Sequence, residues 1–355
     1  MNKILLVTAE YPPDVGGVAN YYYHLVQNAS NNEYHVLDNS RNQLLNPWIK
    51  SIWAIIKEAK VNKVDYLLAG QILPIGTAVV CASLFLRKPF AVFIHGMDIA
   101  VPQKFIRKKI LLKFILRRAD KIITISDFTE QQIKNLIPGR MHSKISIIPP
   151  GPSITPRKLG KVSERVNKQL PKNFFLSVGR LVQRKGFDKA IEAMSLLSES
   201  FDHVHYVIAG SGSYKENLID LATKLQLQHR VHVMEGLTDA EVAELYNRCE
   251  FFVMPSRIIN KQDFEGFGIT VLEANSFGKL AIGGNTAGMT DAILDGKTGI
   301  LVNPDDSQKI ADAIQRLLSK PDRAKRLGAQ AQQWVKNEHD WHIKAQRIAK
   351  LLSGS

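Results

Sequence analysis

The stretch that decides the fold runs from Phe264 to Lys279 and reads Phe-Glu-Gly-Phe-Gly-Ile-Thr-Val-Leu-Glu-Ala-Asn-Ser-Phe-Gly-Lys. Its glycines predict a loop, and the apolar residues that follow predict a helix. Glycine lets the backbone approach a ligand closely, and the first N–H groups of a helix face anions. We therefore expect five consecutive residues to bind a diphosphate: Gly266, Phe267, Gly268, Ile269 and Thr270.

Two glutamates flank this loop. Glu273 lies about one and a half turns into the predicted helix, where a carboxylate can accept hydrogen bonds from ribose hydroxyls. Glu265 precedes the glycines and can hold the hydroxyls of a second sugar. Two carboxylates beside a phosphate-binding loop suit a nucleotide-sugar. An ordinary amphipathic helix with a solvated Glu273 is the alternative that this motif alone leaves open.

Glu265 and Glu273, with seven residues between them, resemble the paired glutamates of the retaining glycosyltransferases of family 4, which have the GT-B fold. Further segments resemble that family in the same order along the chain. They are the glycine loop Tyr11–Ala19, the histidine turn Phe93–Asp98, the segment Ile148–Gly151 before the interdomain linker, and the diphosphate-binding strand and loop Ser177–Gly186. The resemblance implies two doubly wound, Rossmann-like α/β domains that face a central cleft.

The resemblance also implies roles for single residues. Arg180 and Lys185 would bind the donor phosphates. His95 would contact the donor sugar and steady positive charge near the anomeric carbon, while Asp98 would shape the histidine turn or reach the acceptor. The alternative for His95 is a structural role, in which a histidine at the end of a strand has its hydrogen bonds satisfied within the protein. With Glu265, these residues give the expected catalytic set His95, Glu265, Arg180 and Lys185.

Glycines elsewhere complete the expected donor site. Gly16 and Gly17 occupy a strand-to-helix turn, where their N–H groups could touch the donor phosphate or admit the acceptor, although simple packing explains most Gly-Gly pairs. By resemblance, Gly210 lies near the donor and Gly236 marks backbone contacts to the nucleobase. Arg184 receives less weight, as a charge that a solvated loop can hold.

No metal is expected in the mechanism, because the chain contains no Asp-x-Asp motif. Asp305 and Asp306 are adjacent and are better read as a turn and a helix cap. Arg180, Lys185 and the helix N-terminus after Gly266 would neutralise the leaving diphosphate instead. The resemblance implies retention by a front-face route in which the departing phosphate receives the acceptor proton, so no protein base is nominated.

The chain-wide pattern is one of strands alternating with helices, which predicts parallel sheets covered on both faces. The proline-rich segment from Pro149 to Pro156 marks a boundary. We expect one domain over residues 1–155 with a terminal helix, residues 340–355, that crosses back to it, and a nucleotide-sugar-binding domain over residues 156–339. The expected strands are Ile4–Thr8, Tyr34–Leu37, Tyr66–Ala69, Phe90–Ile94, Lys121–Ile125 and Ile145–Ile148, and then Phe174–Val178, His205–Ala209, Val231–Val233, Phe251–Met254, Leu280–Gly283 and Gly299–Val302.

Length and composition fit such an enzyme. The 355 residues suffice for two cores. No apolar run is long enough to cross a bilayer, and the chain passes from Asn2 and Lys3 directly into a strand without a cleavable signal, so we expect a cytoplasmic protein. Cys81 and Cys249 lack metal-ligand spacing and are expected to be small buried hydrophobes.

Positive charge gathers between Gln103 and Lys121, which hold eight basic residues against Asp120 alone, a net of seven out of the chain's +14. The basic residues are Lys104, Arg107, Lys108, Lys109, Lys113, Arg117, Arg118 and Lys121. Aliphatic residues at helical spacing separate them, which is typical of a helix that lies on an anionic membrane surface. A core-packed helix with a solvated basic face is the equal alternative. Nucleic acid is not expected, because stacking aromatic residues are missing.

These observations predict a retaining, metal-independent transferase. It would move a hexosyl unit from a UDP- or GDP-sugar to a lipid-linked, polysaccharide or glycolipid acceptor in bacterial envelope glycan synthesis, at the inner face of the plasma membrane. Asp263 gives Asp-x-Glu-Gly, which we associate with GDP-mannose enzymes that use lipid acceptors, without excluding a UDP-sugar. A nucleotide-sugar epimerase on the same scaffold and a non-catalytic sugar- or lipid-binding protein are the alternatives.

Overall fold

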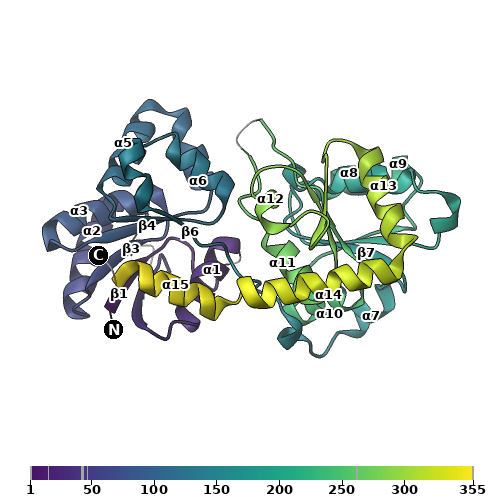
Figure 1. The fold of residues 1–355 in the computed structure, drawn as a ribbon, viewed down its shortest axis with the longest axis horizontal. Coiled ribbons are helices and arrows are strands. Elements are labelled where there is room, and N and C mark those ends of the chain that lie inside the picture. Colours follow the sequence, from purple (N-terminus) through teal and green to yellow (C-terminus); the bar gives the residue numbers. More distant parts are fainter. Residues whose placement is uncertain (1, 15, 41–43, 46, 261–262, 354–355) are drawn as a thin grey trace. The chain divides into compact units, whose positions relative to one another are not determined.

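The structure is a computed structural model that describes residues 2–14, 16–40, 44–45, 47–260 and 263–353. The chain forms two compact units (Figure 1). The N-terminal unit comprises Met1–Gly151 with Asp340–Ser355, and the C-terminal unit comprises Pro152–His339. The division thus falls after Gly151 rather than after residue 155.

The N-terminal unit is built on a parallel six-stranded sheet with the order β2-β1-β3-β4-β5-β6. Its strands are β1 (Asn2–Val7), β2 (Asn32–Leu37), β3 (Tyr66–Ala69), β4 (Phe90–Ile94), β5 (Lys121–Thr124) and β6 (Ile145–Ile147). Each expected strand is present, with ends that differ by at most two residues. Residues of β3 and β4 are buried throughout, which is why these strands read as continuous apolar runs rather than as alternating ones.

Helices cover both faces of this sheet (Figure 1). They are α1 (Gly17–Gln27), α2 (Trp48–Val61), α3 (Thr77–Leu86), α4 (Met97–Ala100), α5 (Ile106–Arg118), α6 (Asp127–Lys134) and α15 (Trp341–Ser353). The terminal helix α15 is joined to α1 by aromatic packing, because Trp341 stacks on His24 at 5.3 Å and meets the Tyr21 ring edge-on at 5.1 Å.

The C-terminal unit repeats the architecture with the order β12-β11-β10-β7-β8-β9, again all parallel. Its strands are β7 (Phe174–Val178), β8 (His205–Ala209), β9 (Val231–Met234), β10 (Phe252–Met254), β11 (Ala281–Gly284) and β12 (Gly299–Val302). Its helices are α7 (Glu164–Gln169), α8 (Phe187–Ser195), α9 (Lys215–Lys224), α10 (Asp239–Arg248), α11 (Ile269–Ser276), α12 (Met289–Ala292), α13 (Ser307–Leu318) and α14 (Pro321–Glu338). Asp306 caps α13 by accepting a hydrogen bond from the Lys309 N–H at 3.0 Å, as the sequence predicts.

The strand orders locate the places where a ligand is held in such sheets. The chain leaves β1 toward one edge of the first sheet and returns to build the other edge from β3, and in the second sheet it does the same at β7 and β10. Doubly wound sheets bind ligands outside the carboxyl ends of the strands at this reversal point. Both groups of expected site residues follow these strands.

The two cysteines differ in their exposure to solvent. Cys249 is buried as expected, but Cys81 is exposed on α3, so its predicted burial is wrong. No helix among the described residues is long and apolar enough to cross a bilayer.

Candidate functional site

In the C-terminal unit, the loop after β7 carries Arg180 and Lys185, the two cations that were predicted to bind the donor phosphates. β7 ends at Val178, a 3₁₀ turn covers Gln183–Lys185, and Gly186 precedes α8. Gly186 has φ of 72°, and a Cβ there would run into the carbonyl of Pro255, which follows β10. The loops after β7 and β10 therefore touch at the reversal point, and only glycine permits that contact.

Lys185 and Glu265 form a buried ion pair at this point. The distance from Lys185 Nζ to Glu265 Oε2 is 2.7 Å, and the two side chains are 9 % and 15 % exposed. Burial raises the pKa of Glu265, but the charges of Lys185, Arg184 and Arg180 outweigh it, so the pKa lies below the usual value. Glu265 is therefore ionised at neutral pH and surrounded by cations.

Arg180 differs from Lys185 because it is exposed and forms no ion pair with any residue that the structure describes. The charge of Arg180 is one of those that lower the pKa of Glu265, so Arg180 lies near the same cluster. An exposed guanidinium beside a buried Lys–Glu pair leaves positive charge available to an anionic ligand.

Arg184 departs from the expectation of a solvated loop charge, because it is buried. Its Nε lies 3.2 Å from Asp263 Oδ1 and donates to the Phe264 carbonyl at 3.3 Å. Arg184 thus fixes the segment that leads into Glu265. Asp263, read in the sequence as part of Asp-x-Glu-Gly, has this pairing as its structural role.

The glycine-rich loop ends at Gly268, which has φ of 100° and precedes α11 without a side-chain cap. The N–H groups of Ile269 and Thr270 open the helix, as predicted, and helix N-termini favour anions. Phe267 was expected to contact the donor, but its side chain is buried and packs near His339 at 5.8 Å between ring centres. Only its backbone remains available to a ligand.

Glu273 is buried within the C-terminal unit and is not solvated. Its Oε1 accepts N–H groups of Ser153 and Ile154 at 3.3 and 3.2 Å, and its Oε2 accepts the Tyr246 hydroxyl at 2.9 Å. Burial raises the pKa of Glu273 to about 7. These contacts attach Ser153 and Ile154 to the C-terminal unit and explain why the division falls before Pro152. A ribose contact remains a prediction, since three protein donors already use this carboxyl group.

The two remaining glycines of the expected donor site have different surroundings. Gly210 follows β8 with φ of 149°, and a Cβ there would run into the Gly179 carbonyl after β7. Gly210 is therefore required for close contact of two loops, independently of any ligand. Gly236 has φ of 67° and no atom within 4 Å of the place of a Cβ, so its conformation, not crowding, favours glycine.

In the N-terminal unit, a polar cluster lies after β1, β3 and β4. Gln71 accepts the Ala9 N–H at 2.9 Å and donates to Thr8 Oγ1 at 3.1 Å, which joins the ends of β1 and β3. Gly16 lies near Glu10, because a Cβ on Gly16 would be 3.7 Å from Glu10 Oε2. Gly17 is the first residue of α1, and Val15 lies outside the described residues.

His95 follows β4 and is half-buried in this cluster. Its Nε2 lies 2.7 Å from the hydroxyl of Tyr22, which itself donates to the Gly70 carbonyl at 2.5 Å. Burial lowers the pKa of His95 to about 3, so the imidazole is neutral at pH 7. A neutral His95 can stabilise positive charge near the anomeric carbon of a bound sugar only through the lone pair or the dipole of its ring.

Asp98 shapes the histidine turn, one of the two roles expected for it. Its Oδ1 accepts the N–H groups of His95 and Gly96 at 3.0 and 2.9 Å. Gly96 has φ of 107°, which favours glycine at this turn. Burial raises the pKa of Asp98 to about 7.

Sequence reasoning missed several members of these clusters. Tyr22, Gln71 and Tyr246 have no motif of their own, and their partners lie 27 to 73 residues away. A buried pair of Arg257 and Asp188, at 2.6 Å, was missed for the same reason. The sequence held one signal for Tyr22, its place in the helix that follows the glycine loop.

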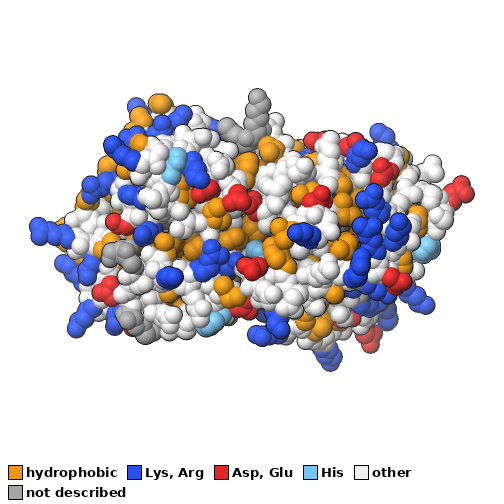
Figure 2. Space-filling model, in the orientation of Figure 1, with side chains coloured by type: hydrophobic (Ala, Val, Ile, Leu, Met, Phe, Trp, Pro, Cys, Tyr) orange, Lys and Arg blue, Asp and Glu red, His pale blue; other side chains and the backbone are white. Residues whose placement is uncertain are grey.

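The basic stretch forms α5 from Ile106 rather than from Gln103, with Lys104 in a preceding 3₁₀ turn and Lys121 in β5. Leu112, Ile115 and Leu116 are buried against the N-terminal core. A second apolar set is exposed: Phe105 (53 %), Ile106 (72 %), Ile110 (62 %) and Phe114 (46 %). The exposed cations Lys104, Arg107, Lys108, Arg117 and Arg118 lie along the same segment. Lys109 and Lys113 are half-buried. Figure 2 shows blue and orange side chains intermixed where Figure 1 places α5.

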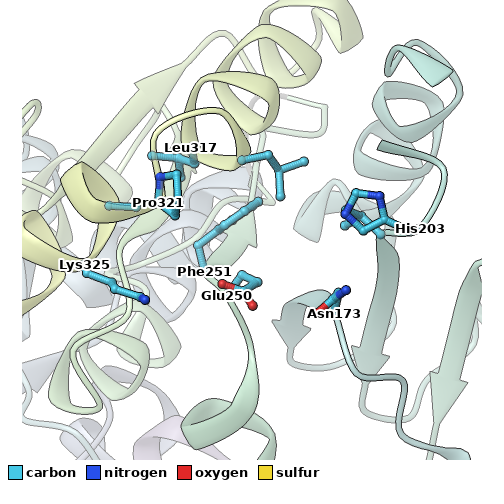
Figure 3. Close-up of a pocket in the computed structure, with 10 residues that line it drawn as sticks. Asn173, His203, Glu250, Phe251, Leu317, Pro321 and Lys325 are labelled. Carbon is cyan, nitrogen blue, oxygen red and sulfur yellow. The ribbon is translucent and has the colours of Figure 1, made fainter. Parts of the chain in front are cut away.

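A surface hollow of about 190 Å³ lies elsewhere in the C-terminal unit (Figure 3). Asn173, Val204 and Phe251, which line it, immediately precede β7, β8 and β10. It therefore lies at the amino ends of the strands, whereas the clustered cations lie at the carboxyl ends. The hollow is not part of the candidate site.

Comparison with known sequences gives two family matches. The model described as Glycosyl transferases group 1 matches residues 161–334, and the model described as Glycosyltransferase Family 4 matches residues 32–154. A GDP-mannose-dependent alpha-(1-6)-phosphatidylinositol monomannoside mannosyltransferase of Mycobacterium tuberculosis is 25% identical over 386 residues, which cover 100% of this chain and 99% of the relative. The protein of the same description from Mycolicibacterium smegmatis is 34% identical over 178 residues, which cover 50% of this chain and 47% of that relative.

Solved structures share the fold. Anabaena HepE in complex with UDP-glucose has a TM-score of 0.79 at 18% identity, covering 100% of both chains. Sucrose-phosphate synthase from Thermosynechococcus elongatus also has a TM-score of 0.79, at 19% identity, covering 100% of this chain and 99% of that one. These likenesses confirm the GT-B fold, with two doubly wound α/β units, that the sequence predicts.

Proposed function

Because the chain belongs to the group 1 glycosyltransferases, we propose that it transfers a hexosyl unit from a UDP- or GDP-sugar to a lipid-linked or polysaccharide acceptor with retention of configuration. The observation that carries the proposal is the buried Lys185–Glu265 pair with exposed Arg180 beside it. A diphosphate needs positive charge at this point, and a bound sugar needs an ionised carboxylate to accept its hydroxyl protons.

Donor binding would use three sources of positive potential. Arg180 is free to bind a phosphate oxygen, and Lys185 can share its three donors between Glu265 and a second oxygen. The N-terminus of α11 supplies N–H groups that no side chain caps. Together they would stabilise the diphosphate as it leaves, so no metal is required.

The reaction breaks the bond between the anomeric carbon and the phosphate oxygen and forms a bond from the same carbon to the acceptor oxygen on the same face. The acceptor proton moves to the departing phosphate oxygen. Neutral His95 would contact the sugar, and ionised Glu265 would hold its hydroxyls. Hydrogen bonds aimed at the charge that develops in the transition state account for the rate enhancement.

The acceptor is proposed to lie at a membrane. Support comes from the exposed apolar residues and cations of α5 and from glycolipid-forming relatives. Each cation near an anionic surface contributes about 1 kcal/mol to the free energy of binding. Exposed aromatic and aliphatic side chains strengthen binding further by burying apolar area in the membrane interface. We propose that the enzyme works at the inner face of a bacterial plasma membrane in envelope glycan synthesis.

The testing experiment incubates the purified chain with radiolabelled GDP-mannose or UDP-glucose and a phosphoinositide or polyprenyl-linked acceptor. Radiolabel in the acceptor, with the anomeric configuration of the donor retained by NMR, is expected. A changed sugar without an acceptor would indicate an epimerase. Donor binding without transfer to any acceptor would indicate a binding protein, and either result would contradict the proposal.

A further inference from the structure

The hydrogen bonds around Tyr22 have a direction that chemistry fixes. Tyr22 Oη lies 2.5 Å from the Gly70 carbonyl oxygen and 2.7 Å from His95 Nε2. A carbonyl oxygen can only accept, and two oxygens this close without a shared hydrogen would repel each other. The single hydroxyl proton of Tyr22 therefore lies on the bond to Gly70.

This leaves one arrangement for the histidine. With its proton committed to Gly70, Tyr22 Oη can only accept from His95, so Nε2 must carry a hydrogen. Neutral imidazole carries one ring N–H, so Nδ1 is a bare acceptor. The structure gives Nδ1 no hydrogen-bond partner among the described residues.

Burial keeps the His95 imidazole neutral and the Tyr22 hydroxyl protonated. Burial strongly opposes protonation of His95, so Nδ1 gains no second hydrogen near neutral pH. Burial raises the pKa of Tyr22 far above its usual value, so its hydroxyl keeps the proton. The ring itself is held in place because Phe93 stacks on it at 5.9 Å and Tyr21 meets it edge-on at 5.5 Å.

We propose that Tyr22, anchored by the Gly70 carbonyl, is a positioning residue that holds His95 in the Nε2–H form, so that Nδ1 accepts a hydrogen bond from a hydroxyl of the transferred sugar. The substrate part rests on the proposed function. In this arrangement His95 cannot act as a proton donor to the sugar or the leaving group. A deoxy nucleotide-sugar, in which hydrogen replaces the sugar hydroxyl that donates to Nδ1, would lack this hydrogen bond.

The hydrogen-bond pattern can be tested without a substrate. Long-range ¹H–¹⁵N spectra of the full chain labelled with ¹⁵N-histidine report which ring nitrogen carries hydrogen, and His95→Gln identifies the signal. We expect Nε2–H alone, unchanged between about pH 5 and pH 8. A hydrogen on Nδ1, or a titration in that range, would overturn the proposal.

Two variants connect the tautomer to catalysis. Tyr22→Phe removes the acceptor of Nε2–H and is expected to give mixed tautomers and a ten- to hundredfold lower kcat, with donor KM changed by less than threefold. Tyr21→Phe is the matched control, because phenylalanine keeps the ring that meets His95 edge-on and removes only a hydroxyl, which donates to the Ile148 carbonyl at 3.1 Å and bonds to no ring nitrogen. It should leave the tautomer unchanged and the rate within about twofold.

The outcomes separate the two proposals. Unchanged tautomer and kcat in Tyr22→Phe would overturn the positioning role. If Tyr22→Phe does not fold, the wild-type spectrum still decides the tautomer, and a deoxy-sugar series on the wild-type enzyme decides whether one hydroxyl is needed. The expected tautomer without transfer from any nucleotide-sugar would refute the proposed function while leaving the Tyr22–His95 geometry standing.

Discussion

Arg180 has the surroundings of a ligand-binding residue, exposed and without an ion-pair partner among the described residues. In Arg180→Ala we expect a loss of roughly a hundredfold in transfer rate, since removing one donor to a developing charge costs about 3 kcal/mol. Its thermal unfolding should match wild type, because the side chain is solvated. Steady-state transfer and calorimetry check both points. Near wild-type turnover would remove Arg180 from the phosphate site.

Lys185 carries the same charge, but its replacement should also reduce stability. Lys185→Ala would leave Glu265 ionised and buried without its nearest cation, and breaking a buried pair in this way typically costs about 3 kcal/mol or more. The matched double variant Lys185→Ala with Glu265→Gln removes both charges and should recover stability but not activity. Denaturant unfolding decides, and equal stability of Lys185→Ala and wild type would speak against the buried pair.

Glu273 should make stability depend on pH. The pKa of Glu273 in the folded chain, about 7, lies above the ordinary glutamate value of about 4.5, so folding favours the protonated form. The stability that it contributes is present below about pH 4.5 and is lost as pH rises through 7. Glu273→Gln, which stays neutral, should gain up to about 3 kcal/mol relative to wild type between pH 4.5 and 8. Asp98 titrates in both proteins and cancels in the difference; parallel pH curves would contradict the prediction.

Site residues that lie in short motifs could be predicted from the sequence, whereas residues placed by long-range contacts could not. Arg180, Lys185, Glu265 and the α11 N-terminus were predicted because they lie in short motifs, and the structure brings Lys185 and Glu265 into contact. Tyr22 was not predicted, because nothing within its own helix records that its hydroxyl meets a carbonyl after β3 and an imidazole after β4. Arg184 was misread because a loop cation is usually solvated, whereas here Asp263 and the Phe264 carbonyl compensate its burial.

At the level of elements, strands were predicted best. Strands such as β3 and β4 are buried on both faces, so their apolar runs end sharply at polar residues, glycine or proline. The start of α5 was predicted three residues early, because Gln103 and Lys104 continue the basic pattern but lie in a separate 3₁₀ turn. Charge pattern alone does not mark a helix start, and here Phe105 interrupts the helix with extended backbone.

Helix α5 gives a prediction at the same scale. Changing Lys108, Lys109, Lys113 and Arg117 to Gln should release the enzyme from anionic vesicles, because each cation contributes about 1 kcal/mol near such a surface. The partition coefficient should fall by up to about a thousandfold in a salt-sensitive assay, while donor binding stays the same.

A matched control tests whether position or net charge decides. Lys309, Arg316, Lys320 and Arg323 are exposed in the C-terminal unit, and changing them to Gln removes the same charge. This variant should sediment with vesicles as wild type does. Equal sedimentation of wild type and the α5 variant would favour the alternative interpretation, a core-packed helix with a solvated basic face.

At the scale of the whole molecule, both units and the return of the terminal helix could be anticipated, because each half restarts a pattern of strands and helices after a proline-rich segment. The boundary itself could not be fixed to the residue. It depends on whether Ser153 and Ile154 donate their N–H groups to a carboxylate 120 and 119 residues further along the chain. Such long-range hydrogen bonds between loops leave no periodicity in the sequence.

Donor binding should stabilise the whole chain without a divalent metal. Arg180, Lys185 and the α11 N-terminus together offset the diphosphate charge, so a UDP- or GDP-sugar should raise the unfolding temperature equally in EDTA and in magnesium. A donor at a hundred times its Kd adds about 2.7 kcal/mol of stability. Arg180→Ala should reduce this shift, while the C-terminal charge variant, whose four cations lie outside the candidate site, should not. A shift or a transfer rate that vanishes in EDTA and returns with magnesium or manganese would show that the metal, rather than these cations, neutralises the leaving group.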